Sequence, residues 1–163
     1  MDLLQLVSIL VAVAVVLVFV AGAAGALRGP MPDDLGLRAD RLTPPGQCRS
    51  PSGGAQWPAG AGARQAGIEP IRFDGDGAGA LTRIGSIVLK MPGARILQSG
   101  PDYLYVQFES RWLRLVDDVE FSVDPAAGLI HVRSAPRLGR RDFGAGRARI
   151  ESIRAAFAAA LPR

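Results

Sequence analysis

The residues best suited to chemistry are three acidic side chains that lie close together in the chain, Asp117, Asp118 and Glu120. On a β-strand, Asp118 and Glu120 share one face while Asp117 points to the other. Two neighbouring carboxylates could hold a cation or act as a general-acid pair. They could instead form ion pairs with arginines of the neighbouring strand and loop. We favour ion pairing, because arginine is abundant in this chain.

A basic stretch follows these residues toward the C-terminus. It contains two acidic residues, Asp142 and Glu151, and seven arginines: Arg133, Arg137, Arg140, Arg141, Arg147, Arg149 and Arg154. The simplest interpretation is a solvated face with internal salt bridges, but such a patch could bind an anionic ligand, lipid headgroups or an acidic partner. We do not expect a nucleic-acid partner, because the stretch lacks interleaved aromatic residues and a known reading module. The candidate ion-pair or anion-binding network comprises Asp117, Asp118, Glu120, Arg133, Arg137, Asp142 and Arg147.

Several familiar site types are excluded by composition. His131 is the only histidine and Cys48 the only cysteine, so histidine-based triads, multi-histidine metal sites and an intramolecular disulfide are ruled out. Residues 74–77 open like a calcium loop, but Gly85 stands where the bidentate glutamate is needed. We therefore predict no metal, no cofactor and no catalytic residues, and we expect the protein not to be an enzyme.

The elements that must position these residues begin with an apolar N-terminus. In residues 6–27, Ser8 is the only polar side chain. A helix of this length spans about 33 Å, close to the ~30 Å hydrocarbon core of a bilayer. A cleaved signal peptide is the competing interpretation, because the small residues at 21–26 resemble cleavage sites. We predict a retained transmembrane anchor over residues 1–28, built from Leu6, Val7, Ile9, Leu10, Val16, Leu17, Phe19, Gly22 and Ala26.

The residues around the end of this anchor bear on its orientation and neighbours. Arg28, Arg38 and Arg41 follow it and no basic side chain precedes it, which favours a cytoplasmic domain by the positive-inside rule. Gly22 and Ala26 form a small-xxx-small pair that would let another transmembrane helix approach closely. The expected partners are the lipid bilayer and other membrane-protein subunits.

The rest of the chain divides into a tether and a domain. Residues 29–67 are rich in Gly, Pro, Ala and Ser, which predicts an extended tether; Trp57 within it could insert at the bilayer interface or dock on the domain. Residues 68–163 form the domain. Its hydrophobic periodicity predicts strands at 68–73, 94–99, 103–110, 119–123 and 129–134, a helix through Leu81, Ile84, Val88 and Met91, and a last helix through Ile150, Ile153, Phe157 and Leu161. The expected fold class is α+β, an antiparallel sheet of about five strands covered by two helices, preceded by a single transmembrane helix.

Motifs in the second half of the chain are similar to those of a known family. They are Val116-Asp117-Asp118-Val119-Glu120-Phe121, Val132-Arg133-Ser134-Ala135, Arg137-Leu138-Gly139, Asp142-Phe143-Gly144 and Arg147-Ala148-Arg149-Ile150. The chain resembles the domain-of-unknown-function family 1499, found in bacteria and plastids, over about residues 68–161. It departs from the pattern at Pro136, where the family has serine, and at Gly146, where the family has asparagine. The resemblance implies the fold and a membrane association more than it implies an activity. We expect the chain in a bacterial inner (cytoplasmic or intracytoplasmic) membrane, as a single-pass protein.

These features together predict a non-enzymatic accessory or structural subunit that binds or stabilises a larger membrane complex, such as a respiratory or photosynthetic one. The alternative is a module that binds an anionic small molecule or lipid through Arg133, Arg137 and Arg147. A third hypothesis is an enzyme that uses Asp118 and Glu120, which requires both carboxylates to line one cleft.

Overall fold

The computed structural model describes residues 2–38, 41–42, 68–138 and 144–160. Several residues to which the sequence drew attention lie outside the described residues: Cys48, Trp57, Gly139, Arg140, Arg141, Asp142, Phe143 and Leu161. So does most of the predicted tether, positions 43–67.

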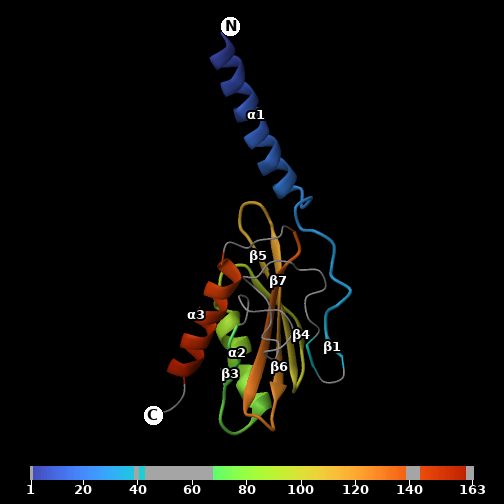
Figure 1. The fold of residues 1–163 in the computed structure, drawn as a ribbon, viewed down its shortest axis with the longest axis vertical. Helices are drawn as coiled ribbons and strands as arrows, with labels where there is room; N and C mark the ends of the chain where they lie inside the picture. The colour runs from blue at the N-terminus through green and yellow to red at the C-terminus, as the bar shows by residue number, and fades with distance from the viewer. Residues whose placement is uncertain (1, 39–40, 43–67, 139–143, 161–163) are drawn as a thin grey trace.

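A long apolar helix, α1 (Leu3–Ala23), stands at the N-terminus and projects away from the domain (Figure 1). A capping box starts it: the Asp2 carboxylate accepts from the Gln5 backbone N–H at 2.8 Å, and the Gln5 side chain accepts from the Asp2 N–H at 3.2 Å. Within the described residues, α1 is the one helix long and apolar enough to cross a membrane, a property that membrane anchors share with signal sequences.

The domain is built on a five-stranded antiparallel sheet with the strand order β3-β7-β6-β5-β4. Its strands are β3 (Ile71–Arg72), β4 (Ala94–Ser99), β5 (Tyr103–Glu109), β6 (Val116–Asp124) and β7 (Leu129–Pro136). The last four form a meander through successive hairpins, and β3 adds to the free side of β7. The predicted α+β class and the antiparallel five-stranded sheet with two covering helices are confirmed; β6 starts three residues earlier than expected.

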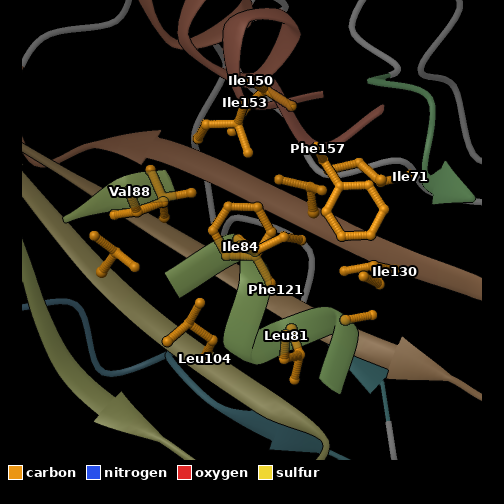
Figure 2. Packing of buried hydrophobic residues seen from close by; sticks show 14 of the residues in the cluster. Ile71, Leu81, Ile84, Val88, Leu104, Phe121, Ile130, Ile150, Ile153 and Phe157 are labelled. Atoms are coloured by element: carbon orange, nitrogen blue, oxygen red, sulfur yellow. The ribbon is translucent and has the colours of Figure 1, made fainter. Parts of the chain in front are cut away.

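Two helices, α2 (Gly77–Val88) and α3 (Ala145–Ala159), cover one face of this sheet (Figure 1). Asp76 caps α2 by accepting hydrogen bonds from the backbone N–H groups of Ala78 and Gly79 at 3.1 and 2.8 Å. The apolar alternation of β5 and β6 points Val106 and Phe121 at the helices. The apolar core therefore lies between the helices and the sheet, as Figure 2 shows for Ile84, Val88, Leu104, Phe121, Ile130, Ile153 and Phe157.

The opposite face of the sheet carries polar and aromatic side chains and is covered by a different element. We call residues 34–38 and 41–42 the strap; it contains the short antiparallel strands β1 (Leu37–Arg38) and β2 (Arg41–Leu42). Leu42 of the strap packs with Tyr103 and Tyr105 of β5 in a small second cluster. The strap belongs to the segment predicted as a tether, and in the structure it lies on the domain; the division of the chain at residues 67 and 68 stays a prediction.

Candidate functional site

The candidate site is the polar face of the sheet beneath the strap. Strand alternation turns Asp118 and Glu120 to this face and Asp117 to the helix side. Both inward carboxylates are almost completely buried. A buried carboxylate is unfavourable unless cations and hydrogen-bond donors surround it, so the partners of these two residues decide what the site can do.

Glu120 stands at the centre of the first group of contacts. Its Oε1 accepts from the Tyr103 hydroxyl at 2.5 Å and from the Gly36 backbone N–H at 2.7 Å, while its Oε2 accepts from Arg133. Arg133 is only 2% exposed, and its Nη2 donates to Asp34 of the strap at 2.7 Å. The strap thus supplies both a backbone donor and a second carboxylate to a buried arginine.

The charges in this group shift the titration of its members. Burial lowers the pKa of the Arg133 guanidinium, but the hydrogen bonds and negative charges of Glu120 and Asp34 outweigh burial and raise that pKa overall. Burial, with the hydrogen bond to Glu120, raises the pKa of the Tyr103 hydroxyl well above its usual value. Arg133 therefore stays charged and Tyr103 stays neutral, so neither is prepared to exchange a proton near neutral pH.

Asp118 organises a second group beside the first. Arg137 donates two parallel hydrogen bonds to it, from Nε to Oδ2 at 2.8 Å and from Nη2 to Oδ1 at 2.9 Å. The Tyr105 hydroxyl donates to Oδ1 at 2.5 Å and itself accepts from Gln107 Nε2 at 3.0 Å. Burial first, and then the hydrogen bond to Asp118, raises the pKa of Tyr105 to about 12. The hydrogen bond to Asp118 also raises the pKa of Arg137.

Asp117 faces the helix layer and forms a separate pair. Its Oδ2 accepts from Arg149 of α3 at 2.8 Å, and the Arg149 guanidinium lies 4.4 Å from the centroid of the Phe108 ring. Each of the three acidic residues therefore binds a different arginine. Arg147, which was predicted to join the network, lies at the start of α3.

The network has members that sequence reasoning did not place in it. Tyr103, Tyr105 and Gln107 alternate along β5 on the side opposite its apolar residues, and this alternation was a usable signal for their shared face. Asp34 and Gly36 carried no such signal, because they lie 99 and 84 residues from the side chains that they contact.

This arrangement leaves the two inward carboxylates engaged with donors rather than with open space. Both oxygens of Glu120 and both of Asp118 accept hydrogen bonds from protein groups. In the part of the chain that the structure describes, no group of three or more His, Cys, Asp or Glu residues is placed to hold a metal ion. The chemistry that this face performs best is mutual neutralisation of buried charges.

A second set of polar contacts joins α1 to the domain. Glu109 at the end of β5 pairs with Arg114 at 2.6 Å and with Arg28 at 3.0 Å, and Arg114 Nη1 also donates to the Ala23 carbonyl of α1 at 3.3 Å. The hydrogen bond from Arg114 lowers the pKa of Glu109 below its usual value. A cation at the last carbonyls of a helix is favourable, because these groups carry the negative end of the helix dipole.

A cavity of about 350 Å³ opens at the same end of the domain. Its walls include Phe108, Val116, Leu115, Leu138, Asp117 and Arg149. It is distinct from the polar face beneath the strap, because Asp117 and Phe108 point to the helix side of the sheet.

Comparison with known proteins places the chain in a family. A family model described as "Protein of unknown function (DUF1499)" matches residues 36–157. No curated protein and no solved structure matches the chain. The matched range covers more than half of the chain and includes the members of the polar network from Gly36 of the strap to Arg149 of α3. The chain belongs to the DUF1499 family.

Proposed function

We propose that the protein is a non-enzymatic, single-pass subunit of a bacterial inner membrane, where its domain binds or stabilises a larger membrane-protein complex. A respiratory or photosynthetic complex is the natural host. The observation that carries this proposal is the enclosure of Asp118 and Glu120 by arginines and tyrosines under the strap. Carboxylates bonded in this way hold strands and strap in one geometry, which suits a structural part better than a reacting one.

The join between α1 and the domain gives further support. A bond from Arg114 to the α1 backbone and the pair between Arg28 and Glu109 tie the helix to the sheet close to the point where α1 ends. A subunit that recognises a membrane-embedded complex benefits from a fixed angle between its anchor and its domain, since less orientational freedom is lost on binding. Apart from Gln5 and Ser8 near its start, the side chains of α1 are apolar on every side, so they can contact lipid or the helices of a partner.

The alternative, a module for an anionic ligand, would need its arginines available. Arg133 and Arg137 are each bonded to a buried carboxylate, so an anion would have to displace Glu120 or Asp118. The observation in favour of this alternative is the cavity beside Arg149, although Asp117 already neutralises that arginine. Stabilisation of the chain by inorganic phosphate, lost in Arg149→Gln, would support it.

Co-purification from native membranes tests the proposal. A tag placed after residue 163 suits this experiment, because α3 runs away from α1 (Figure 1). Membranes are solubilised in mild detergent, and the captured subunits are quantified against the tagged chain. We expect a defined set of membrane subunits at fixed stoichiometry.

A matched variant makes the outcome sharper. It replaces residues 3–21 by a leucine-alanine helix of the same length and keeps Gly22, so the anchor remains but its specific surface is lost. Retention of the subunits by this variant would place the contact on the domain, and their loss would place it on α1. Recovery of the native chain alone, from fully solubilised membranes, would refute the subunit proposal.

A further inference from the structure

The loop between β5 and β6, residues 110–115, is held in one conformation. Its ends are bridged by hydrogen bonds from the Ser110 N–H to the Leu115 carbonyl at 2.9 Å and from the Leu115 N–H to the Ser110 hydroxyl at 3.0 Å. Arg114 adopts a positive φ of 53° there, a conformation that few non-glycine residues accept. An ordered loop of this kind can present a side chain at a fixed position.

This loop lies against the last turn of α1 (Figure 1). Gly22 is buried at the contact, and a Cβ added to it would come within 2.9 Å of the Leu113 Cα atom. The predicted role of Gly22 was close approach of another transmembrane helix; in the structure the missing side chain admits this loop. The loop therefore lies at the depth of the final turn of the apolar helix.

The loop exposes an aromatic side chain at that depth. Trp112 is 68% exposed, and the Arg111 guanidinium lies 5.2 Å from the centroid of its ring. Leu115 and Leu138 are also exposed hydrophobic residues at this end of the domain. An indole has an apolar ring and a polar N–H group, and tryptophan is accordingly enriched where bilayer and water meet.

The position and the charge of the loop agree with a lipid surface. The 21 residues of α1 measure about 31 Å, so a helix that spans the ~30 Å core brings its last turn to the interface. The contacts between the loop and α1 carry the positive charges of Arg28, Arg111 and Arg114 and the single negative charge of Glu109. The net charge there is positive, and each unneutralised arginine near an anionic leaflet adds about 1 kcal/mol of attraction.

We propose that the β5–β6 loop is a second membrane contact, in which Trp112 inserts into the interfacial layer of the leaflet that α1 leaves and Arg111 meets lipid phosphates. The contact places the end of the sheet that carries the β5–β6 loop directly on the bilayer. It requires α1 to span a membrane, as proposed above, but it requires no partner subunit.

Depth-dependent fluorescence quenching tests this contact in the full chain. The sequence contains two tryptophans, so Trp57→Phe leaves Trp112 as the only one. The variant is reconstituted in phosphatidylcholine vesicles containing a minor fraction of phosphatidylglycerol, with bromine on either shallow or deep acyl carbons. We expect blue-shifted emission, strong quenching by the shallow bromines, weaker quenching by the deep ones, and protection from aqueous iodide.

A matched control carries its tryptophan at the other end of the sheet. Ala126, in the exposed turn after β6, is separated from the loop by the length of that strand, roughly 27 Å. In Trp57→Phe/Trp112→Phe/Ala126→Trp, emission should be quenched by iodide and unaffected by brominated lipid.

The outcomes separate this contact from the membrane span on which it rests. Equal iodide quenching of Trp112 and of the Ala126→Trp control, in a chain that resists alkaline carbonate extraction, would overturn the loop contact alone. Release of the chain by carbonate would overturn the span and the contact together. Protection of Trp112 in native membranes but not in pure lipid vesicles would assign the loop to a protein partner and overturn the lipid contact.

Discussion

Removal of Arg133 is the sharpest perturbation of the buried polar face. In Arg133→Met, Glu120 keeps its bonds from Tyr103 and Gly36 but loses its cation, and Asp34 loses its ion pair with Arg133. Breaking a buried ion pair by deleting one member costs about 3–5 kcal/mol. One effect opposes this loss, because the buried Nε of Arg133 has no hydrogen-bond partner, and its removal recovers about 1 kcal/mol. We therefore expect a net loss of about 3 kcal/mol, a large share of the ~5–15 kcal/mol that stabilises a typical domain.

The assay is urea unfolding of the full chain in nonionic detergent, followed by near-ultraviolet circular dichroism. Both tyrosines of the sequence, Tyr103 and Tyr105, lie in the network, so the tyrosine bands of this spectrum report on the polar face. Arg72→Met, a change at an exposed arginine of β3, is the matched control and should alter stability by no more than about 0.5 kcal/mol.

A double-mutant cycle shows whether the pair with Glu120 is responsible. Replacing both residues in Arg133→Met/Glu120→Met leaves no buried unpaired charge at the pair, so the double variant should be more stable than the sum of the single losses by about 2 kcal/mol. Additive losses, or a cost below about 1 kcal/mol for Arg133→Met as for a surface pair, would refute the reasoning.

Three further results are expected. The pKa of Tyr105 is raised to about 12, and that of Tyr103 is raised further. The contribution of the two hydroxyls to stability is therefore complete below the unfolded pKa near 10 and is lost as pH rises through the folded values. Absorbance titration should detect no tyrosinate in the folded chain at pH 10, and ionisation of either tyrosine at that pH would contradict this expectation. Gly93→Ala should lower the urea midpoint by the equivalent of about 2–3 kcal/mol, because φ is 74° and the new Cβ collides with the Glu109 carbonyl; an unchanged midpoint would show that the turn can relax. Asp76→Ala should cost about 1 kcal/mol by uncapping α2, with Asp76→Asn restoring most of it, and equal losses in the two variants would contradict a capping role.

The strands and helices of the domain were predictable because each repeats a local pattern. Leu104, Val106 and Phe108 alternate on β5, and Ile150, Ile153 and Phe157 share one face of α3, so period alone indicated strand and helix. The same alternation placed Asp118 and Glu120 together on a face and Asp117 opposite.

The cover of the polar face could not be predicted in this way. The strap has two strands of two residues each, too short to show a period, and its contacts depend on side chains far along the chain. The pairing of Arg149 with Asp117 was also missed. The rotation of α3 on the sheet decides which arginine of the basic stretch reaches this carboxylate, and the sequence does not specify that rotation. Local pattern determines elements, whereas three-dimensional packing selects partners among many similar charges.

The strap has a consequence for the order in which the domain is assembled during synthesis. It is the next described element after α1 and leaves the ribosome before any strand of the five-stranded sheet. Arg133, which pairs with Asp34 across 99 residues, is made near the end of the chain. Closing a loop of that length costs about 4 kcal/mol of chain entropy. The contact between Asp34 and Arg133 can offset this cost only after β6 and β7 have paired and placed Arg133 on the polar face. The first part of the domain to be translated is therefore the last to dock. A nascent chain passes through a state in which the meander is formed while its charged face is still exposed to solvent.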